Sequence, residues 1–141
     1  MNKITFEKSI RTDQQKVFDI VTNFEDFERL LPEFYPSIVI KSIRDESSLV
    51  SEHLKLAGKE FVIMAKHFSL PPEKHVMRVV GGDIKGSYIK EWFVPMANGT
   101  KIIVEAELNI PKSIDNLFNI SKYQNSLKKL YEKFIGIVES N

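Results

Sequence analysis

The stretch that decides the fold is GGDIKGSYIKEWFVPMANGTKIIVEAEL, residues 81–108. It contains two segments in which the side chains alternate in character, joined by a turn at Asn98-Gly99. Because successive side chains of a strand point to opposite faces of a sheet, alternation separates the inside of the fold from the outside. The stretch therefore predicts a β-hairpin, and its alternation places a lysine, Lys90, among the inner residues.

The rest of the chain contains further strand candidates, separated by short sequences that favour turns. Together with the hairpin, the candidates are residues 3–11, 38–44, 49–56, 60–68, 75–80, 87–94 and 101–108. The connections from the second candidate onward are short, as antiparallel hairpins require.

Two short helices are predicted after the first strand, and one long helix after the last. Thr12 or Asp13 can cap the first helix, because a short side-chain oxygen accepts the free N–H groups of a first turn. Pro32 ends the second helix. Ser113 is the expected cap of the long helix, which can break early at the weak helix former Asn119. Its apolar stripe consists of Leu117, Ile120, Leu127, Leu130, Tyr131, Phe134, Ile135 and Val138.

A long amphipathic helix needs an apolar surface to cover, and a twisted sheet offers one on its concave face. The order of elements thus predicts an α+β fold in which a curved antiparallel sheet of about six to seven strands grips the C-terminal helix. We expect one domain over residues 1–141.

The composition excludes several classes of function. The formal net charge is +1, without the concentrated positive charge that a nucleic-acid interface needs. The absence of cysteine excludes disulfides, a thiol nucleophile and a thiolate metal site. The N-terminus lacks the apolar core of a signal peptide, and no apolar run reaches the ~20 residues of a membrane helix. We therefore expect a cytoplasmic location and no nucleic-acid partner.

Several motifs together resemble the START-like, helix-grip superfamily. They are an early strand followed by QQKVFDIVTNFEDFERLLP (residues 14–32), a Gly-rich loop, and a strand with Trp92 and Phe93, then Pro95 and Gly99-Thr100 before a β-branched strand. This superfamily includes polyketide cyclases and dehydrases, birch-pollen-allergen-like proteins and coenzyme Q-binding proteins. The resemblance covers nearly the whole chain and implies a cavity between the sheet and the long helix.

Hairpin pairing predicts which residues face that cavity, since directly opposed residues share a face. The predicted apolar face comprises Val50, Leu54, Leu56, Phe61, Ile63, Val76, Val80, Tyr88, Trp92, Ile102, Val104, Ala106 and Leu108. The predicted outer face comprises Ser51, Lys55, Glu60, Lys66, Glu91, Glu105 and Glu107. A one-residue slip at any turn would reverse the assignment of the strand that follows.

Four polar residues fall on the predicted inner face, namely Glu52, His67, Arg78 and Lys90. A buried charge costs several kcal/mol unless it is paired or hydrated. Glu52, Arg78 and Lys90 are therefore candidates to anchor the polar end of an apolar ligand; alternatively, they form a structural ion pair or reach solvent at the sheet edge. The full set of candidate ligand-binding residues is Glu52, His67, Arg78, Tyr88, Lys90, Trp92, Val104, Leu127 and Tyr131.

No catalytic residue, metal site or cofactor is predicted. His67 lacks an evident nucleophile or carboxylate partner, and His53, His67 and His75 lie on separate strands without the spacing of metal ligands. The glycines of residues 81–86 do not fit a phosphate-binding loop and indicate a turn. The loop residues Phe34, Tyr35 and Pro36 either line the cavity entrance, touch a membrane or partner transiently, or pack on the core.

Three functions remain open at this point. The leading hypothesis is a non-enzymatic carrier or sensor that binds a small hydrophobic molecule, such as a lipid, a quinone or a polyketide-like compound. The second is a cyclase- or dehydratase-like enzyme acting on a polyketide-like substrate. The third is a protein-interaction module of the co-chaperone or ribosome-associated type, for which we expect a filled interior and an exposed apolar patch.

Overall fold

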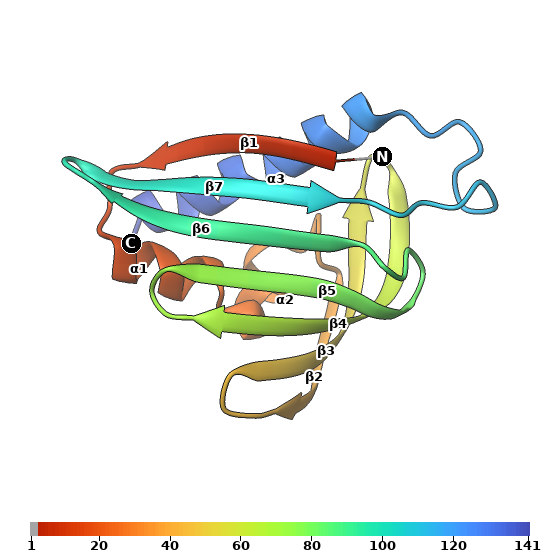
Figure 1. Cartoon of the computed structure of the whole chain (residues 1–141), viewed down its shortest axis with the longest axis horizontal. Coiled ribbons are helices and arrows are strands. Elements are labelled where there is room, and N and C mark those ends of the chain that lie inside the picture. The colour runs from red at the N-terminus through yellow and green to blue at the C-terminus, as the bar shows by residue number, and fades with distance from the viewer. Residues whose placement is uncertain (1–2) are drawn as a thin grey trace.

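The computed structural model describes residues 3–141 and confirms the predicted α+β class (Figure 1). Its antiparallel sheet has seven strands in the order β1-β7-β6-β5-β4-β3-β2. The strands are β1 (Lys3–Ile10), β2 (Ser37–Ile43), β3 (Ser47–Leu56), β4 (Lys59–Leu70), β5 (Lys74–Gly82), β6 (Tyr88–Met96) and β7 (Gly99–Glu107). The helices are α1 (Gln14–Val21), the 3-10 turn η1 (Phe24–Asp26), α2 (Phe27–Leu30) and α3 (Ile120–Glu139).

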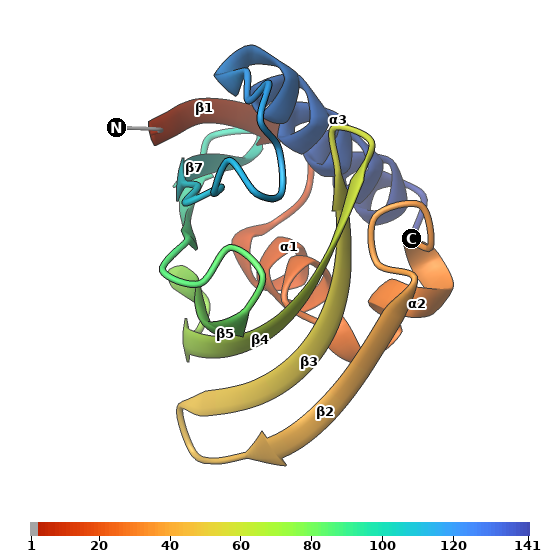
Figure 2. The ribbon, with the colours of Figure 1, turned by 90° about the vertical axis from the view of Figure 1, so that its right-hand side faces the viewer.

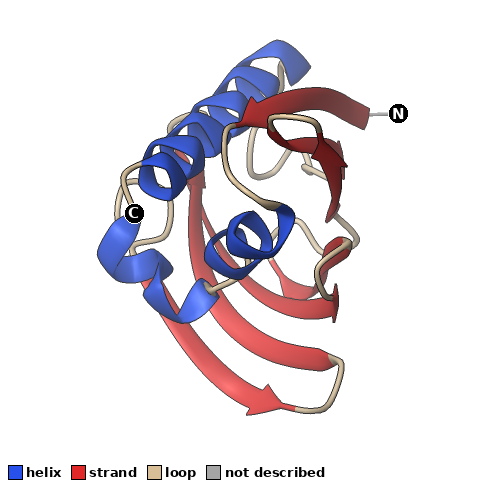
Figure 3. Cartoon of the chain, turned by 90° about the vertical axis from the view of Figure 1, so that its left-hand side faces the viewer, coloured by secondary structure: helices blue, strands red, loops and turns tan. Residues whose placement is uncertain are grey.

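The sheet is strongly curved, and the helices lie on its concave side (Figures 2 and 3). Helix α1 sits within the curve, while α3 runs across it and contacts both β1 and β3. The buried face of α3 is formed by Tyr123, Leu127, Leu130, Tyr131, Phe134 and Val138. The predicted stripe thus covers the inner face of the sheet through these residues. Its first member, Leu117, was wrongly predicted, because it lies before α3 begins and is 80% exposed.

Side-chain caps define where the two longer helices begin. Asp13 accepts a hydrogen bond from the backbone N–H of Lys16, as a cap of α1 should. Asn119 caps α3 by accepting from the N–H of Ser121. The expected start of the long helix near Ser113 is therefore wrong, because the weak helix former Asn119 serves as the cap and α3 begins at Ile120.

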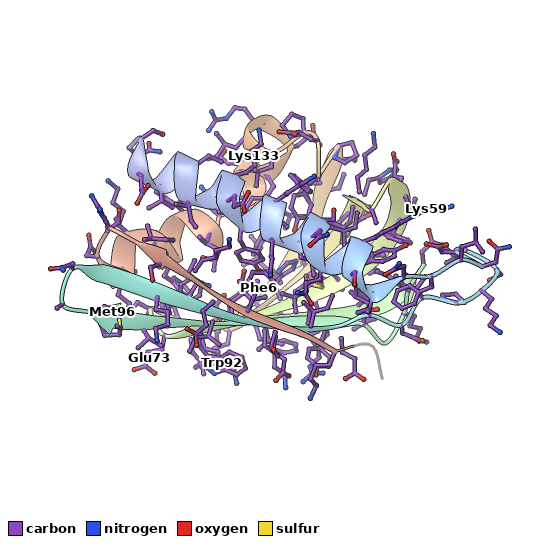
Figure 4. The ribbon with its side chains drawn as sticks, turned by 90° about the horizontal axis from the view of Figure 1, so that it is seen from above. Phe6, Lys59, Glu73, Trp92, Met96 and Lys133 are labelled. Atoms are coloured by element: carbon purple, nitrogen blue, oxygen red, sulfur yellow. The ribbon has the colours of Figure 1, made fainter. Side chains whose placement is uncertain are left out.

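The predicted faces of β3, β4 and β7 are confirmed, whereas those of β5 and β6 are reversed. The residues buried on these two strands are His75, Met77, Val79, Ile89, Glu91 and Phe93. Those predicted to be inside, Val76, Arg78, Val80, Tyr88, Lys90 and Trp92, lie on the outer face. Figure 4 shows Trp92 on the side of the sheet away from α3, while Phe6 lies between α3 and the sheet.

The first reversal arises at the connection between β4 and β5. A two-residue Pro71-Pro72 turn was expected, but Leu70 pairs with Lys74 and three residues lie between them. The extra residue, Glu73, donates its backbone N–H to the carbonyl oxygen of Leu70 at 2.8 Å. One additional residue in a connection exchanges the two faces of the strand that follows.

The second reversal arises at the hairpin between β6 and β7. The turn residues are Ala97 and Asn98, because Met96 pairs with Gly99. Gly99 belongs to β7, where its φ is +147° and a Cβ atom would lie 2.0 Å from the carbonyl oxygen of Ile10. The glycine is thus required by the close approach of β1 and not by the turn. The two one-residue errors cancel, so β7 faces as predicted.

Candidate functional site

The structure divides the predicted site residues between the two faces of the sheet. Glu52, His67 and Val104 are buried on the inner face, opposite Leu127 and Tyr131 of α3. Arg78, Tyr88, Lys90 and Trp92 lie on the outer face, so their predicted place in the cavity is wrong. The anchor that was expected to combine Glu52 with Arg78 and Lys90 therefore does not exist, since the sheet separates them.

The four outer residues form aromatic–cation contacts at the surface. The ammonium of Lys90 and the guanidinium of Arg78 lie 4.8 Å and 5.7 Å from the ring centroid of Tyr88. Lys74 makes a similar contact with Trp92, at 5.1 Å. Such contacts at exposed sites contribute about 0.5–1 kcal/mol each. The four residues therefore pack against one another or against Lys74 on the protein surface.

A continuous chain of hydrogen bonds crosses the inner face. His67 Nε2 is 2.5 Å from a carboxylate oxygen of Glu52, and His67 Nδ1 is 2.9 Å from Nε2 of His75. His75 Nδ1 is in turn 2.6 Å from Oε1 of Glu91, whose Oε2 accepts a hydrogen bond from the hydroxyl of Tyr131. The five side chains come from β3, β4, β5, β6 and α3, so the fold itself assembles what we call the polar chain.

The polar chain is removed from solvent along its whole length. Glu52, His67, His75 and Glu91 are 1%, 5%, 6% and 4% exposed. The two imidazole planes are inclined by only 17° with centroids 5.1 Å apart. With facing nitrogens 2.9 Å apart, the rings meet edge to edge in a hydrogen bond rather than face to face. The ring of Phe24 covers His67 at a centroid distance of 4.5 Å.

Two buried tyrosines take part in this site: Tyr131, which is the last member of the polar chain, and Tyr35. Burial, followed by the charge of Glu91, raises the pKa of Tyr131 well above its ordinary value. Burial, followed by the charges of Glu52 and Glu91, does the same to the pKa of Tyr35. Both phenols therefore remain protonated hydrogen-bond donors. The hydroxyl of Tyr35 hydrogen-bonds to none of the residues that the structure describes. It is not a fully buried atom without a partner, since none of the described side chains contains such an atom, and Tyr35 instead lines a cavity.

Tyr35 and every member of the polar chain except Glu52 line a small cavity between the sheet and the helices. Its volume is about 20 Å³, which is room for about one water molecule. Its polar lining consists of Tyr35, His67, His75, Glu91 and Tyr131, and its apolar lining of Val21, Phe27, Met77, Ile89 and Phe134. The site combines an apolar wall with a few convergent polar groups, as small-molecule sites commonly do.

Residues 24–35, which we call the cover, close this cavity on the side away from the sheet. Phe27 packs against Tyr35 and Phe134 at centroid distances of 4.9 Å and 5.3 Å. Phe34 and Tyr35 are buried, so of the roles considered for this loop the structure shows packing on the core. The carbonyl oxygen of Phe34 accepts from the N–H of Lys55, which ties the cover to β3.

Sequence reasoning missed His75, Glu91 and Tyr35 as site residues. His75 and Glu91 are direct cross-strand partners, but both were placed by the reversed register of β5 and β6. One signal in the sequence favours the observed register. It leaves Arg78 and Lys90 in solvent and buries instead a histidine and a glutamate that can pair with each other.

The described part of the chain contains no cluster of three or more acidic or histidine side chains arranged to hold a metal ion. The polar chain is extended, with each imidazole nitrogen already engaged in a hydrogen bond. Within the same residues, no helix is long and apolar enough to cross a membrane.

Comparison with solved structures identifies the architecture. A Thermus thermophilus protein aligns with a TM-score of 0.84 and 12% identity, covering 98% of this chain and 97% of that one. A START superfamily protein from Mycobacterium smegmatis aligns with a TM-score of 0.82 and 14% identity over 98% and 97% of the two chains. The Zhui aromatase/cyclase from Streptomyces aligns with a TM-score of 0.73 and 10% identity over 97% and 93%.

These likenesses confirm the predicted resemblance to the START-like, helix-grip superfamily at the level of the fold. No family model and no curated protein sequence matches the chain. Since fold does not determine function, the chemistry has to be argued from the site.

Proposed function

We propose that this protein binds a small hydrophobic molecule between the curved sheet and α3, with one oxygen atom of the ligand at the polar chain. The observation that carries the proposal is Tyr35. Its hydroxyl hydrogen-bonds to no described residue, and Tyr35 lines a cavity with His67, His75 and Glu91. A ligand oxygen in the enlarged cavity would accept a hydrogen bond from this hydroxyl, and a typical hydrogen bond contributes about 0.5–1.5 kcal/mol.

A ligand larger than a water molecule requires the cover to move. The present cavity of about 20 Å³ is far below the 300–1,000 Å³ of typical ligand pockets. The contacts that must loosen are aromatic: Phe24 on His67, and Phe27 on Tyr35 and Phe134. The apolar body of the ligand would replace these contacts, and burial of its surface would provide most of the affinity.

The experiment compares two probes that differ by one polar group, 2-naphthol and 2-methylnaphthalene. Hydrogen bonding to Tyr35 should make 2-naphthol bind about two- to thirteenfold more tightly, which corresponds to a net hydrogen bond of ~0.5–1.5 kcal/mol. Tyr35→Phe should abolish the difference. The matched control is Tyr88→Phe on the outer face, which should preserve it. Equal affinities in the wild-type protein, or an unchanged preference in Tyr35→Phe, would contradict the proposal.

One observation favours a second candidate, the protein-interaction module. The interior is nearly filled, and large apolar side chains are exposed on the outer face of β4 and β5: Val62, Phe68, Leu70 and Val80. If neither probe binds at any accessible concentration, this candidate becomes the better account. The substitution of Lys90 and Arg78 does not separate the hypotheses, because both residues lie outside the cavity.

The cyclase- or dehydratase-like enzyme stays a proposal of lower rank. The Zhui protein that shares the fold is an aromatase/cyclase, and the polar chain provides the acid–base groups that the sequence did not reveal. Detection of a chemical change in a bound carbonyl compound, dependent on His75 and Glu91, would move it ahead of the carrier or sensor.

A further inference from the structure

The polar chain contains more hydrogen bonds than its groups can make in their ordinary protonation states. Each carboxylate of Glu52 and Glu91 only accepts. Nε2 of His67 and Nδ1 of His75 must therefore be the donors toward them. A neutral imidazole carries a single N–H, so these two bonds use the only proton of each ring.

With both N–H protons used in this way, two unprotonated ring nitrogens face each other. Nδ1 of His67 and Nε2 of His75 lie 2.9 Å apart, a hydrogen-bond distance. Two lone pairs at this separation repel, and the contact becomes favourable only when a proton lies between them. Three bridging protons are thus needed where two neutral imidazoles and two carboxylates provide two.

We infer that the polar chain binds one excess proton, shared between His67 and His75, and that this proton makes the imidazole pair the acid of the interior site. The charge balance supports the assignment. No lysine or arginine lines the cavity among the described residues, so the proton is the positive charge available to two buried carboxylates. Buried carboxylates without such a counter-charge are strongly unfavourable.

The excess proton belongs on the imidazoles rather than on a carboxylate. Free imidazole is the stronger base, with a pKa of about 6.5 against about 4.3 for glutamate. Both oxygens of Glu91 already act as acceptors, toward His75 and Tyr131, and leave no position for a carboxyl proton to donate within the polar chain. The other titratable groups that face the pair are Glu52 from β3, Tyr131 from α3 and Tyr35 from the cover, and both tyrosines stay neutral.

The inference deepens the proposed function, on which its ligand part rests. A bound ligand would be a hydrophobic molecule with a basic oxygen, such as a carbonyl compound or the anion of a phenol or an enol. In the transfer, an imidazole N–H bond breaks, an O–H bond forms on the ligand, and the electron pair stays on the ring nitrogen. The pair is then left with opposed lone pairs, which favours recapture of a proton from water or from the ligand.

The test uses the unliganded protein, so it is independent of ligand binding. In protein labelled with 15N at histidine, two-bond nitrogen–proton correlation spectra should show one strongly deshielded proton coupled to Nδ1 of His67 and Nε2 of His75. His53, whose imidazole lies at the surface 2.9 Å from Glu60, provides the exposed reference in the same spectra and should show no such shared proton. Two unprotonated facing nitrogens, or an ordinary N–H on one of two neutral rings, would overturn the inference.

A pair of variants separates the charge balance from general effects of substitution. Glu52→Gln removes one buried carboxylate and should shift the loss of the shared proton to lower pH. Glu60→Gln, which removes the carboxylate beside the exposed His53, should leave that pH unchanged. The same shift in both variants, or none in Glu52→Gln, would overturn the role of the buried carboxylates. If the shared proton is found but 2-naphthol shows no preference, the proton site stands and the proposed ligand binding falls.

Discussion

The inner and outer faces of this sheet carry the same kinds of side chain under opposite conditions. Both have a histidine–glutamate pair: His75 and Glu91 inside, at 2.6 Å, and His53 and Glu60 outside, at 2.9 Å. The inner side chains are 7% and 5% exposed, and the outer ones 36% and 42%. Water can replace a partner of the outer pair but not of the inner one. Burial, and not pairing alone, therefore makes such a contact a determinant of the fold.

The largest expected effect is the loss of one buried carboxylate. Glu91→Ala should reduce the free energy of unfolding by about 3–5 kcal/mol, because it leaves His75 and Tyr131 without their acceptor in the buried interior. The matched outer change, Glu60→Ala, should cost at most about 1 kcal/mol. Urea denaturation of both variants measures the difference. Similar losses in the two proteins would remove the basis of the comparison.

Apolar side chains of the C-terminal segment should show the same contrast slightly less strongly. Leu127 lies on the buried face of α3 and is fully buried, whereas Leu117 is 80% exposed. Leu127→Ala should cost about 2–5 kcal/mol through lost contacts and the space left behind. Leu117→Ala should change stability by no more than about 0.5 kcal/mol. A Leu117→Ala loss comparable with that of Leu127→Ala would mean that α3 does not cover the core as described.

The hydrogen bond from Tyr131 to Glu91 should have a smaller, pH-dependent effect. Tyr131→Phe should cost about 1.5–3 kcal/mol at neutral pH, since it removes a hydrogen bond to a charged group. The raised pKa of Tyr131 means that the folded state keeps this proton more tightly than the unfolded state. Its contribution is thus complete below the ordinary tyrosine pKa of about 10 and is lost as the pH rises toward the folded value.

Stability measured by urea unfolding from neutral to alkaline pH should therefore fall above pH ~10 in the wild-type protein, and the fall should be shallower in Tyr131→Phe. Tyr35 and Tyr123, whose pKa values are also raised by burial, account for part of the slope that remains. An identical alkaline slope in the two proteins would show that Tyr131 ionises as easily in the folded state as in the unfolded one.

The smallest effects are expected on the outer face. Lys90→Ala removes a cation from the face of Tyr88 and should cost about 0.5–1 kcal/mol. It should leave the binding of 2-naphthol unchanged, because the sheet lies between Lys90 and the cavity. A loss of 2-naphthol binding in Lys90→Ala would instead support the inner position that the sequence first suggested.

The sequence was sufficient for the class and order of elements, because these depend on periodicity and caps that are local. Local patterns predicted the alternation in β3, β4 and β7, the cap at Asp13 and the buried part of the stripe of the C-terminal helix. The resemblance to the helix-grip superfamily rested on the same local patterns, and the structural comparisons confirm it at the level of the fold.

The polar chain could not be predicted from the sequence, because it depends on the lengths of the connections between strands. Glu73 in the β4–β5 loop and the position of Gly99 in β7 decide which faces of β5 and β6 are buried. Both alternations of β5 are half apolar, with Val76 and Val80 on one face and Met77 and Val79 on the other, so hydrophobicity alone does not choose between them. Pairing energies between His67, His75 and Glu91 are long-range and appear only once the strands are aligned.

We propose that ligands bind in the space between the sheet and α3, and titration of isotope-labelled protein with 2-naphthol, followed by methyl NMR, tests this placement. We expect chemical-shift changes at methyl groups around the cavity and on the inner side of α3, notably Val21, Met77 and Leu127, with little change at the exposed Val62 and Val80. Changes confined to Val62 and Val80 would contradict it and would place the binding surface on the outer face.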